Sequence, residues 1–220
     1  PWANATLKLW AEEDGEYIIF HGNDLPNIEC GLILAIAHSN RQYSGIMIVS
    51  CENIYLQDIR LLNGPGMGLL PMHTKNLYID GFKLCYDERS PGIIANEADG
   101  IHAVACSGDF ILKNSIIEGI IDDALNIHSN FYQVTSSEGD TIKAFPAGAV
   151  SAEYKIFDKG DTIAIYKGAT LEKNAEYIIK DLRCLEDKIV EIKVDRPLLK
   201  HEKGDVIENL SAQAKVNISN

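Results

Sequence analysis

Three aspartates have the spacing of a catalytic cluster. Asp99 is followed 23 residues later by Asp122, and Asp123 comes directly after it. Carboxylates about 5 Å apart repel each other, so three in one patch cannot all be ionised at neutral pH and one keeps its proton. A protonated acid beside an ionised carboxylate is what glycoside hydrolysis needs, to protonate the leaving oxygen and to activate water or attack carbon. We therefore predict that Asp99, Asp122 and Asp123 are catalytic.

The spacing leaves the stereochemistry of such a reaction open. Inverting glycosidases hold their two carboxyl groups roughly 6.5–9.5 Å apart, and retaining ones hold them at about 5–5.5 Å. Asp99 directly over Asp122 would give the shorter distance, and the diagonal to Asp123 a longer one. A structural alternative is that these residues cap turns, as we expect for Asp58, Asp80 and Asp109.

Further polar side chains follow the aspartates and fit a sugar-binding role. His102, Asn126 and His128 come three to five residues after Asp99 or Asp123. His73 falls in the column of His128, two repeats earlier. Hydroxyl-rich sugars need fixed donors and acceptors of this kind, so we predict that these four residues bind substrate. No histidine pair has a tight ligand spacing, so we expect neither a metal nor another cofactor.

A repeat in the first part of the chain places these residues. Similar segments begin at Gly45, Gly68 and Gly100, with steps of 23 and 32 residues, and a further step of 23 leads to Asp123. No unit has a helical stripe or the leucine pattern of a leucine-rich repeat. The period predicts an all-β fold made of parallel β-helix coils. Such coils would bring Gly45, Gly68, Gly100 and Asp123 into one column.

The longer step contains a nine-residue insertion between Asp87 and Ala98. Insertions in a solenoid become loops on one face, often the binding face. We expect this loop to form one wall of the sugar pocket, with Arg89 or Glu97 near the substrate.

The repeat stops after Asn130. Short β-rich runs with Gly-Asp turns follow, which is typical of a small antiparallel barrel. The segment from Ala214 resembles the strands at Asn53 and Asn76 again. We expect β-helix coils over residues 1–130, an inserted barrel over 131–212 and the start of the next coil over 213–220, with the chain cut in mid-coil.

Composition excludes several functional classes. The 220 residues include 20 basic and 32 acidic side chains, a net charge of −12, which argues against a nucleic-acid partner. Apolar runs are far shorter than the roughly 20 residues that span a bilayer, so we expect no membrane insertion. The five cysteines form no Cys-x-x-Cys pair, and we expect free thiols; they are Cys30, Cys51, Cys85, Cys106 and Cys184. The oligomeric state and the compartment are not readable from the residues.

Several motifs together resemble glycoside hydrolase family 110, the α-1,3-galactosidases that remove terminal galactose, including from blood-group B structures. They are Ser44-Gly-Ile-Met-Ile-Val-Ser-Cys-Glu-Asn-Ile-Tyr-Leu, Gly64-Pro-Gly-Met-Gly, Ala98-Asp-Gly-Ile-His, Ile121-Asp-Asp-Ala-Leu-Asn-Ile-His, Phe157-Asp-Lys-Gly-Asp-Thr-Ile and Lys203-Gly-Asp-Val-Ile-Glu-Asn. The likeness runs from about residue 41 to 220.

The resemblance implies a right-handed parallel β-helix with a barrel insertion, and metal-independent, inverting, exo-acting hydrolysis of a galactose-terminated glycan. It also implies catalysis by Asp99, Asp122 and Asp123, and a secreted or periplasmic location. It does not separate linear from branched substrates.

Two alternatives remain. A polygalacturonase-like hydrolase also uses an Asp followed by an Asp pair on a β-helix, but its anionic substrate calls for basic residues, and the net charge here is −12. A non-catalytic glycan-binding module would need no registered carboxylates. Asp99→Asn separates these classes, because a binding module would keep its function and a hydrolase would lose turnover.

Overall fold

The computed structural model describes residues 10–22, 31, 43–87, 89, 92–147 and 156–220. The chain divides into two units, Pro1–Ile36 and Ala37–Asn220. In the described part, every regular element is a β-strand apart from one short 3-10 helix, η2 (Glu186–Lys188), so the predicted all-β class is confirmed. No helix there is long and apolar enough to cross a membrane.

The first unit contains a β-hairpin of β1 (Trp10–Asp14) and β2 (Tyr17–His21). Gly15, at φ 63°, supplies the left-handed turn between the strands. Across the hairpin, Trp10 stacks on His21 with ring centroids 3.9 Å apart, and His21 Nε2 lies 3.0 Å from Glu12 Oε1.

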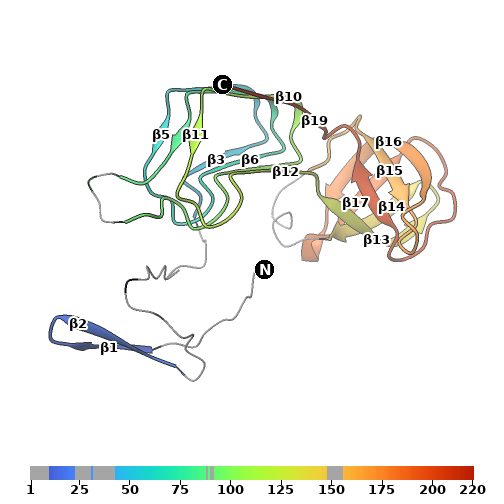
Figure 1. The fold of residues 1–220 in the computed structure, drawn as a ribbon. Helices are drawn as coiled ribbons and strands as arrows, with labels where there is room; N and C mark the ends of the chain where they lie inside the picture. The colour runs from blue at the N-terminus through green and yellow to red at the C-terminus, as the bar shows by residue number, and fades with distance from the viewer. Residues whose placement is uncertain (1–9, 23–30, 32–42, 88, 90–91, 148–155) are drawn as a thin grey trace. The chain divides into compact units, whose positions relative to one another are not determined.

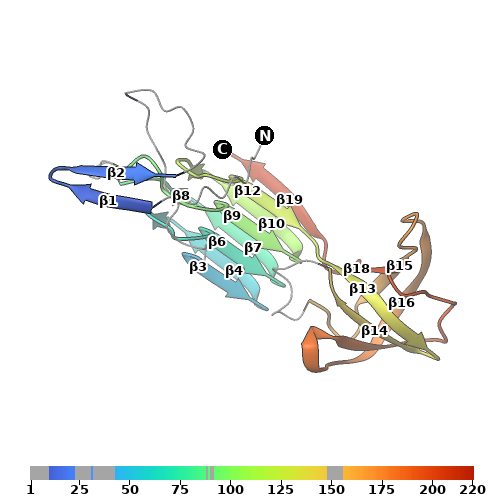
Figure 2. The same ribbon diagram turned by 90° about the horizontal axis from the view of Figure 1, so that it is seen from below.

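The second unit begins with stacked coils that build three parallel sheets (Figures 1 and 2). The first sheet has the order β12-β9-β6-β3, the second β19-β10-β7-β4 and the third β11-β8-β5. Each circuit of the chain adds one strand to each sheet. The strands are β3 (Ile46–Val49), β4 (Glu52–Gln57), β5 (Arg60–Leu61), β6 (Leu69–Met72), β7 (Lys75–Asp80), β8 (Lys83–Leu84), β9 (Ile101–Val104), β10 (Ser107–Lys113), β11 (Ile116–Ile117), β12 (Leu125–His128) and β19 (Ala214–Ser219).

Apolar side chains fill the inside of the coils. Alternate strand residues point inward, and those of neighbouring coils stack in register. Leu69, Ile101 and Phe82 are fully buried in this core, and Leu77 and Phe110 pack there one above the other. The sheets therefore present their remaining side chains outward, where a site can form.

The 23-residue step holds for the first two coils and then fails by one residue. Ile46 pairs with Leu69 and Leu69 with Ile101, but Ile101 pairs with Leu125, 24 residues on. The reason is a bulge in β10, where the register with β7 shifts between Ser107 and Phe110. Gly108, at φ 68°, lies in that bulge and lengthens the third coil. The column of Gly45, Gly68 and Gly100 thus continues to Ala124, and the prediction of Asp123 there is wrong.

A closed antiparallel barrel follows the coils, drawn in yellow to red in Figure 1. Its strands are β13 (Phe131–Glu138), β14 (Thr141–Pro146), β15 (Thr162–Tyr166), β16 (Lys173–Cys184), β17 (Val190–Val194) and β18 (Val206–Asn209), in the order β13-β14-β17-β16-β15-β18. β19 then returns to pair in parallel with β10. Barrel and coils share one apolar core, in which Leu70, Met72 and Val104 of the first sheet meet Tyr132 and Phe157.

The cysteines of the described residues are free, namely Cys51, Cys85, Cys106 and Cys184. Cys30 lies outside the described residues.

Candidate active site

The three aspartates come together at the start of two neighbouring strands. Asp99 precedes β9, and Asp122 and Asp123 precede β12. One carboxylate oxygen from each lies within 4.8 Å of those of the other two. The spacing correctly predicts this meeting of side chains, but the partners differ in detail. Because Ile101 pairs with Leu125, Asp99 lies opposite Asp123 and not opposite Asp122.

Asp122 and Asp123 reach the same patch because the chain before β12 is a turn. Adjacent residues on a regular strand would point to opposite faces. Gly119, at φ 68°, bends the chain there, as the sequence suggests. The backbone N–H of Asp123 donates to Asp122 Oδ1 at 3.2 Å. Asp122 is half-buried, whereas Asp123 is exposed.

Asp99 is the most enclosed of the three, with 5% of its surface exposed. Asn126 Nδ2 donates to its Oδ2 at 3.2 Å, and His102 Nδ1 hydrogen-bonds the same oxygen. His102 and Asn126 are paired neighbours on β9 and β12, so the register of the sheet sets this geometry. Asp99 is therefore held in place through Oδ2, and no described hydrogen bond occupies Oδ1.

A histidine chain continues from Asp99. His102 Nε2 lies 2.8 Å from His128 Nε2, and His128 Nδ1 lies 2.9 Å from the carbonyl oxygen of Ser129. A carbonyl can only accept, so His128 carries its hydrogen on Nδ1 and accepts at Nε2. His102 must then donate from Nε2, and its Nδ1 shares one proton with Asp99. These contacts make His102 and His128 supports of a carboxylate, whereas the sequence suggests contacts to sugar.

Asn96 also positions Asp99, although the spacing of the aspartates does not point to it. Its side chain is fully buried, and Nδ2 donates to the carbonyl oxygens of Ala98 and Asp99, each at 2.9 Å. A Cβ at Gly64, the residue paired with Asn96 on the preceding coil, would collide with Asn96 Oδ1. The glycine of one coil opposite an asparagine of the next is the signal that could have revealed it.

His73 lies away from the carboxylates, contrary to the predicted column. His128 aligns with Val104 and Met72, so His73 is one residue out of its column. Its ring contacts Ser50 and Asp158 instead and lines a separate cavity. The one-residue bulge at Gly108 explains this error too.

Of the two candidate residues in the insertion loop, Arg89 is bound to a neighbouring residue of the same loop. Arg89 donates from Nε and Nη2 to the carboxylate of Asp87, at 2.9 and 2.7 Å, and its guanidinium lowers the pKa of that carboxyl. Glu97 is half-buried two residues before Asp99.

The site so defined is a cluster of three carboxylates on an all-β scaffold, with Asp99 buried, Asp122 half-buried and Asp123 exposed. Paired carboxyl groups of this kind are what glycosidases use. Curated relatives share this part of the chain. α-1,3-Galactosidase A of Bacteroides fragilis is 28% identical over 195 residues, covering 87% of this chain and 32% of the relative. α-1,3-Galactosidase B of Bacteroides thetaiotaomicron is 27% identical over 195 residues, covering 86% and 31%. α-1,3-Galactosidase B of Parabacteroides distasonis is 32% identical over 112 residues, covering 50% and 18%.

These relatives support assigning the chain to a family like glycoside hydrolase family 110, and the resemblance stated from the motifs is confirmed. No family model matches the chain. The chain spans about a third of the length of the B. fragilis and B. thetaiotaomicron relatives.

Proposed function

We propose that this chain carries the catalytic centre of an exo-acting α-galactosidase that removes terminal α-1,3-linked galactose from glycans, without a metal and with inversion. The observation that carries the proposal is the environment of Asp99. Asp99 is buried, and the side chains of Asn126 and His102 both hydrogen-bond its Oδ2. The carboxylates of Asp122 and Asp123 lie within 4.8 Å of it. An assembly of like charges gives a fold no stability, so chemistry is its best explanation.

The proposal includes the architecture. The stacked coils, with their parallel register, are a right-handed parallel β-helix, since crossover connections between parallel strands are right-handed in about 98% of cases. The sequence predicts coils over residues 1–130, but residues 10–21 form the antiparallel hairpin of the first unit, so we propose coils that run, in the described residues, from β3 at Ile46 to β12 at His128. A barrel over 131–212 interrupts them, and they resume at 213–220. The relatives' names support the galactoside as substrate.

In the proposed reaction, Asp99 is the base. It is enclosed and fixed through Oδ2, so its free Oδ1 suits holding a water molecule better than reaching the sugar. Asp123, its neighbour in register, helps to bind that water. One of Asp122 and Asp123 keeps its proton and gives it to the leaving oxygen. The carboxylate spacing of at most 4.8 Å is nearer to that of retaining enzymes, so inversion rests on the resemblance and on the enclosure of Asp99.

A leaving-group series tests these roles in the full-length protein. α-Galactosyl fluoride needs no acid, because fluoride leaves unprotonated. Asn at the acid position should lower turnover of an α-1,3-galactosyl disaccharide by about 10²–10⁴-fold and spare the fluoride, whereas Asp99→Asn should impair both. Loss of neither activity in Asp99→Asn would refute the base assignment.

Proton NMR of the first sugar released gives the stereochemistry. We expect β-galactose, and α-galactose as the first product would show retention.

The same three carboxylates could hold a cation, so metal independence needs its own test. Turnover after exhaustive chelation should equal that of the untreated protein. Loss on chelation and recovery with a divalent ion would replace the metal-independent mechanism.

A further inference from the structure

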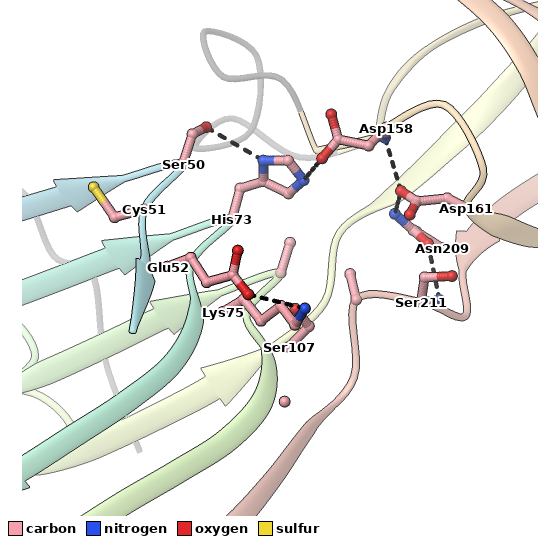
Figure 3. A pocket seen from close by; sticks show the side chains of 13 residues that line it. Ser50, Cys51, Glu52, His73, Lys75, Ser107, Asp158, Asp161, Asn209 and Ser211 are labelled. Carbon is pink, nitrogen blue, oxygen red and sulfur yellow. Dashed lines mark hydrogen bonds and ion pairs between the residues drawn. The ribbon is translucent and has the colours of Figure 1, made fainter. Parts of the chain in front are cut away.

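A polar cavity lies at the opposite end of the first sheet from the aspartates, where the chain leaves β3 and β6. Its volume is about 630 Å³, and coil residues Ser50 and His73 line it together with Asp158 and Asp161, which directly precede barrel strand β15 (Figure 3).

Three of its side chains form a serine–histidine–aspartate chain. Ser50 Oγ lies 3.3 Å from His73 Nδ1, and His73 Nε2 lies 3.1 Å from Asp158 Oδ2 (Figure 3). The Asp158 carboxylate can only accept, so His73 carries its hydrogen on Nε2. The lone pair on Nδ1 therefore faces the Ser50 hydroxyl, which is the tautomer that a general base needs.

The coil geometry presents the serine and the histidine together. Both occupy turn positions with left-handed backbone, at φ 51° for Ser50 and 46° for His73. The Ser50 N–H donates to the Met72 carbonyl at 3.0 Å, which stacks Ser50 over His73 on the next coil. The same left-handed backbone recurs at Ala105, φ 50°, on the following coil, so this corner belongs to the coil repeat and places the two polar side chains one above the other.

Asp158 is held from the barrel side. Its backbone N–H donates to Asp161 Oδ2 at 2.7 Å, and Asn209 Nδ2 donates to that same oxygen at 2.8 Å. Asn209 is almost fully buried, so this bracing belongs to the packed barrel. The orienting carboxylate thus comes from a different element from the nucleophile and the base, as such triads often require.

We propose that Ser50, His73 and Asp158 form a second catalytic centre, of the serine-hydrolase type, that cleaves carboxylic esters. Ser50 Oγ bonds to the acyl carbon while its proton passes to His73 Nδ1. The ester C–O bond breaks, and the leaving alcohol takes that proton. Water then attacks the acyl-serine with His73 again as base, which releases the carboxylic acid and restores Ser50.

The cavity indicates a neutral, hydroxyl-rich ester such as an O-acylated sugar. Its charged lining residues are three acids, Glu52, Asp158 and Asp161, and one base, Lys75. Lys75 forms an ion pair with Glu52 at 3.0 Å. This acidic balance disfavours phosphate esters and other anions. Lys75 supplies positive charge near the oxyanion that forms during acyl transfer.

A fluorophosphonate probe tests the nucleophile, because it reacts with activated serines. We expect one adduct on the full-length protein, mapped to Ser50 by peptide mass spectrometry, and hydrolysis of 4-nitrophenyl acetate. Ser50→Gly and His73→Asn are the variants of choice, since Gly and Asn tolerate left-handed backbone and preserve the turns. Both should lower the labelling rate by at least about 10²-fold, the low end for loss of a general base. Ser107→Ala, a serine of the same cavity without a described histidine contact, is the matched control.

The outcomes separate this centre from the proposed galactosidase. Asp99→Asn should keep full labelling of Ser50, and Ser50→Gly should keep galactoside turnover and the thermal unfolding midpoint. No adduct, an adduct at another residue, or undiminished labelling of His73→Asn would overturn the proposal.

Discussion

The proposed chemistry of this molecule depends on the environment of a single carboxylate. Asp99 accepts from Asn126 at one oxygen, shares a proton with His102 at that same oxygen, and has its own carbonyl bound by Asn96. Hydrogen bonds to a charged group stabilise it by about 1.5–3 kcal/mol each, and here they also fix its direction. Asp122 is half-buried and Asp123 is exposed, so both carboxyl groups are closer to solvent than that of Asp99, and we therefore assign the acid to one of them and the base to Asp99.

Replacement of His102 distinguishes support of Asp99 from contact with sugar. His102→Asn should lower kcat for the galactoside by about 10–100-fold, the equivalent of one lost charged hydrogen bond, and leave KM nearly unchanged. Steady-state kinetics of the full-length protein measures both constants. A large rise in KM at constant kcat would restore the substrate-binding role that the sequence suggests.

The sequence predicts which residues form the candidate site, but it predicts only some of the contacts between them. The spacing of Asp99, Asp122 and Asp123 is enough to predict their meeting. The pairing of Asp99 with Asp123 depends on one extra residue at Gly108, which a repeat with few units does not reveal. Asn96 acts through its side-chain amide on backbone carbonyls, and its one sequence signal, the opposing Gly64, is visible only once the register of the coils is known.

At the scale of elements, close stacking of glycines sets how the coils approach each other. A Cβ on Gly100 would lie 2.5 Å from Ile117 Cγ2 and 2.7 Å from the Ala124 carbonyl oxygen. The second contact is with backbone, which cannot move aside without shifting β12. The column therefore explains both the repeat in the sequence and the position of Asp99 beside it.

Gly100→Ala should cost about 1–3 kcal/mol of unfolding free energy through overpacking, and it should lower turnover because Asp99 is the adjacent residue. Urea denaturation measures the first effect. Gly139→Asn is the control, since Gly139 has left-handed backbone and open space around its Cβ position. Unchanged stability in Gly100→Ala would contradict the stacking geometry.

The barrel contains a buried histidine that makes its stability depend on pH. Burial lowers the pKa of His201 below its ordinary value of 6.5, against the opposing charge of Asp205. Leu199 N–H donates to Tyr177 Oη at 2.9 Å, so the tyrosine hydroxyl donates onward to His201 Nε2 at 3.1 Å, which also favours the neutral ring.

Because the unfolded chain binds this proton more readily than the folded one, stability should fall as pH drops through about 6.5. Denaturation at pH 7.5 and 5.5 measures the fall, and His201→Gln should reduce it. Equal pH dependence in the parent and the variant would refute the assignment.

At the scale of the whole second unit, coils and barrel depend on one core. Leu70, Met72 and Val104 project from the outer face of the first sheet into the cluster that Tyr132 and Phe157 help to build. The polar side chains of His102, Asn126 and His128 project from the same outer face of the sheet. The sequence predicts two bodies, because a change of period is visible, but it cannot show that their apolar faces are shared.

Met72→Ala should therefore cost about 2–5 kcal/mol and lower the stability of coils and barrel together. Hydrogen exchange followed by NMR should show amides of β9 and β15 losing protection in parallel. Met47→Ala is the matched control, since Met47 projects from the same sheet but is 48% exposed. Loss of protection in the coils alone would mean that the two parts unfold independently.

The most direct test of the catalytic role of Asp99 is to compare galactose release by the parent protein and by Asp99→Asn. The full-length protein should hydrolyse an α-1,3-galactosyl disaccharide, and Asp99→Asn should reduce kcat by at least about 10²-fold with its unfolding midpoint preserved. Asp58→Asn, an exposed turn aspartate with left-handed backbone that Asn also adopts, should behave as the parent. Near-normal turnover in Asp99→Asn, or a parent without activity on any α-galactoside, would contradict the central claim.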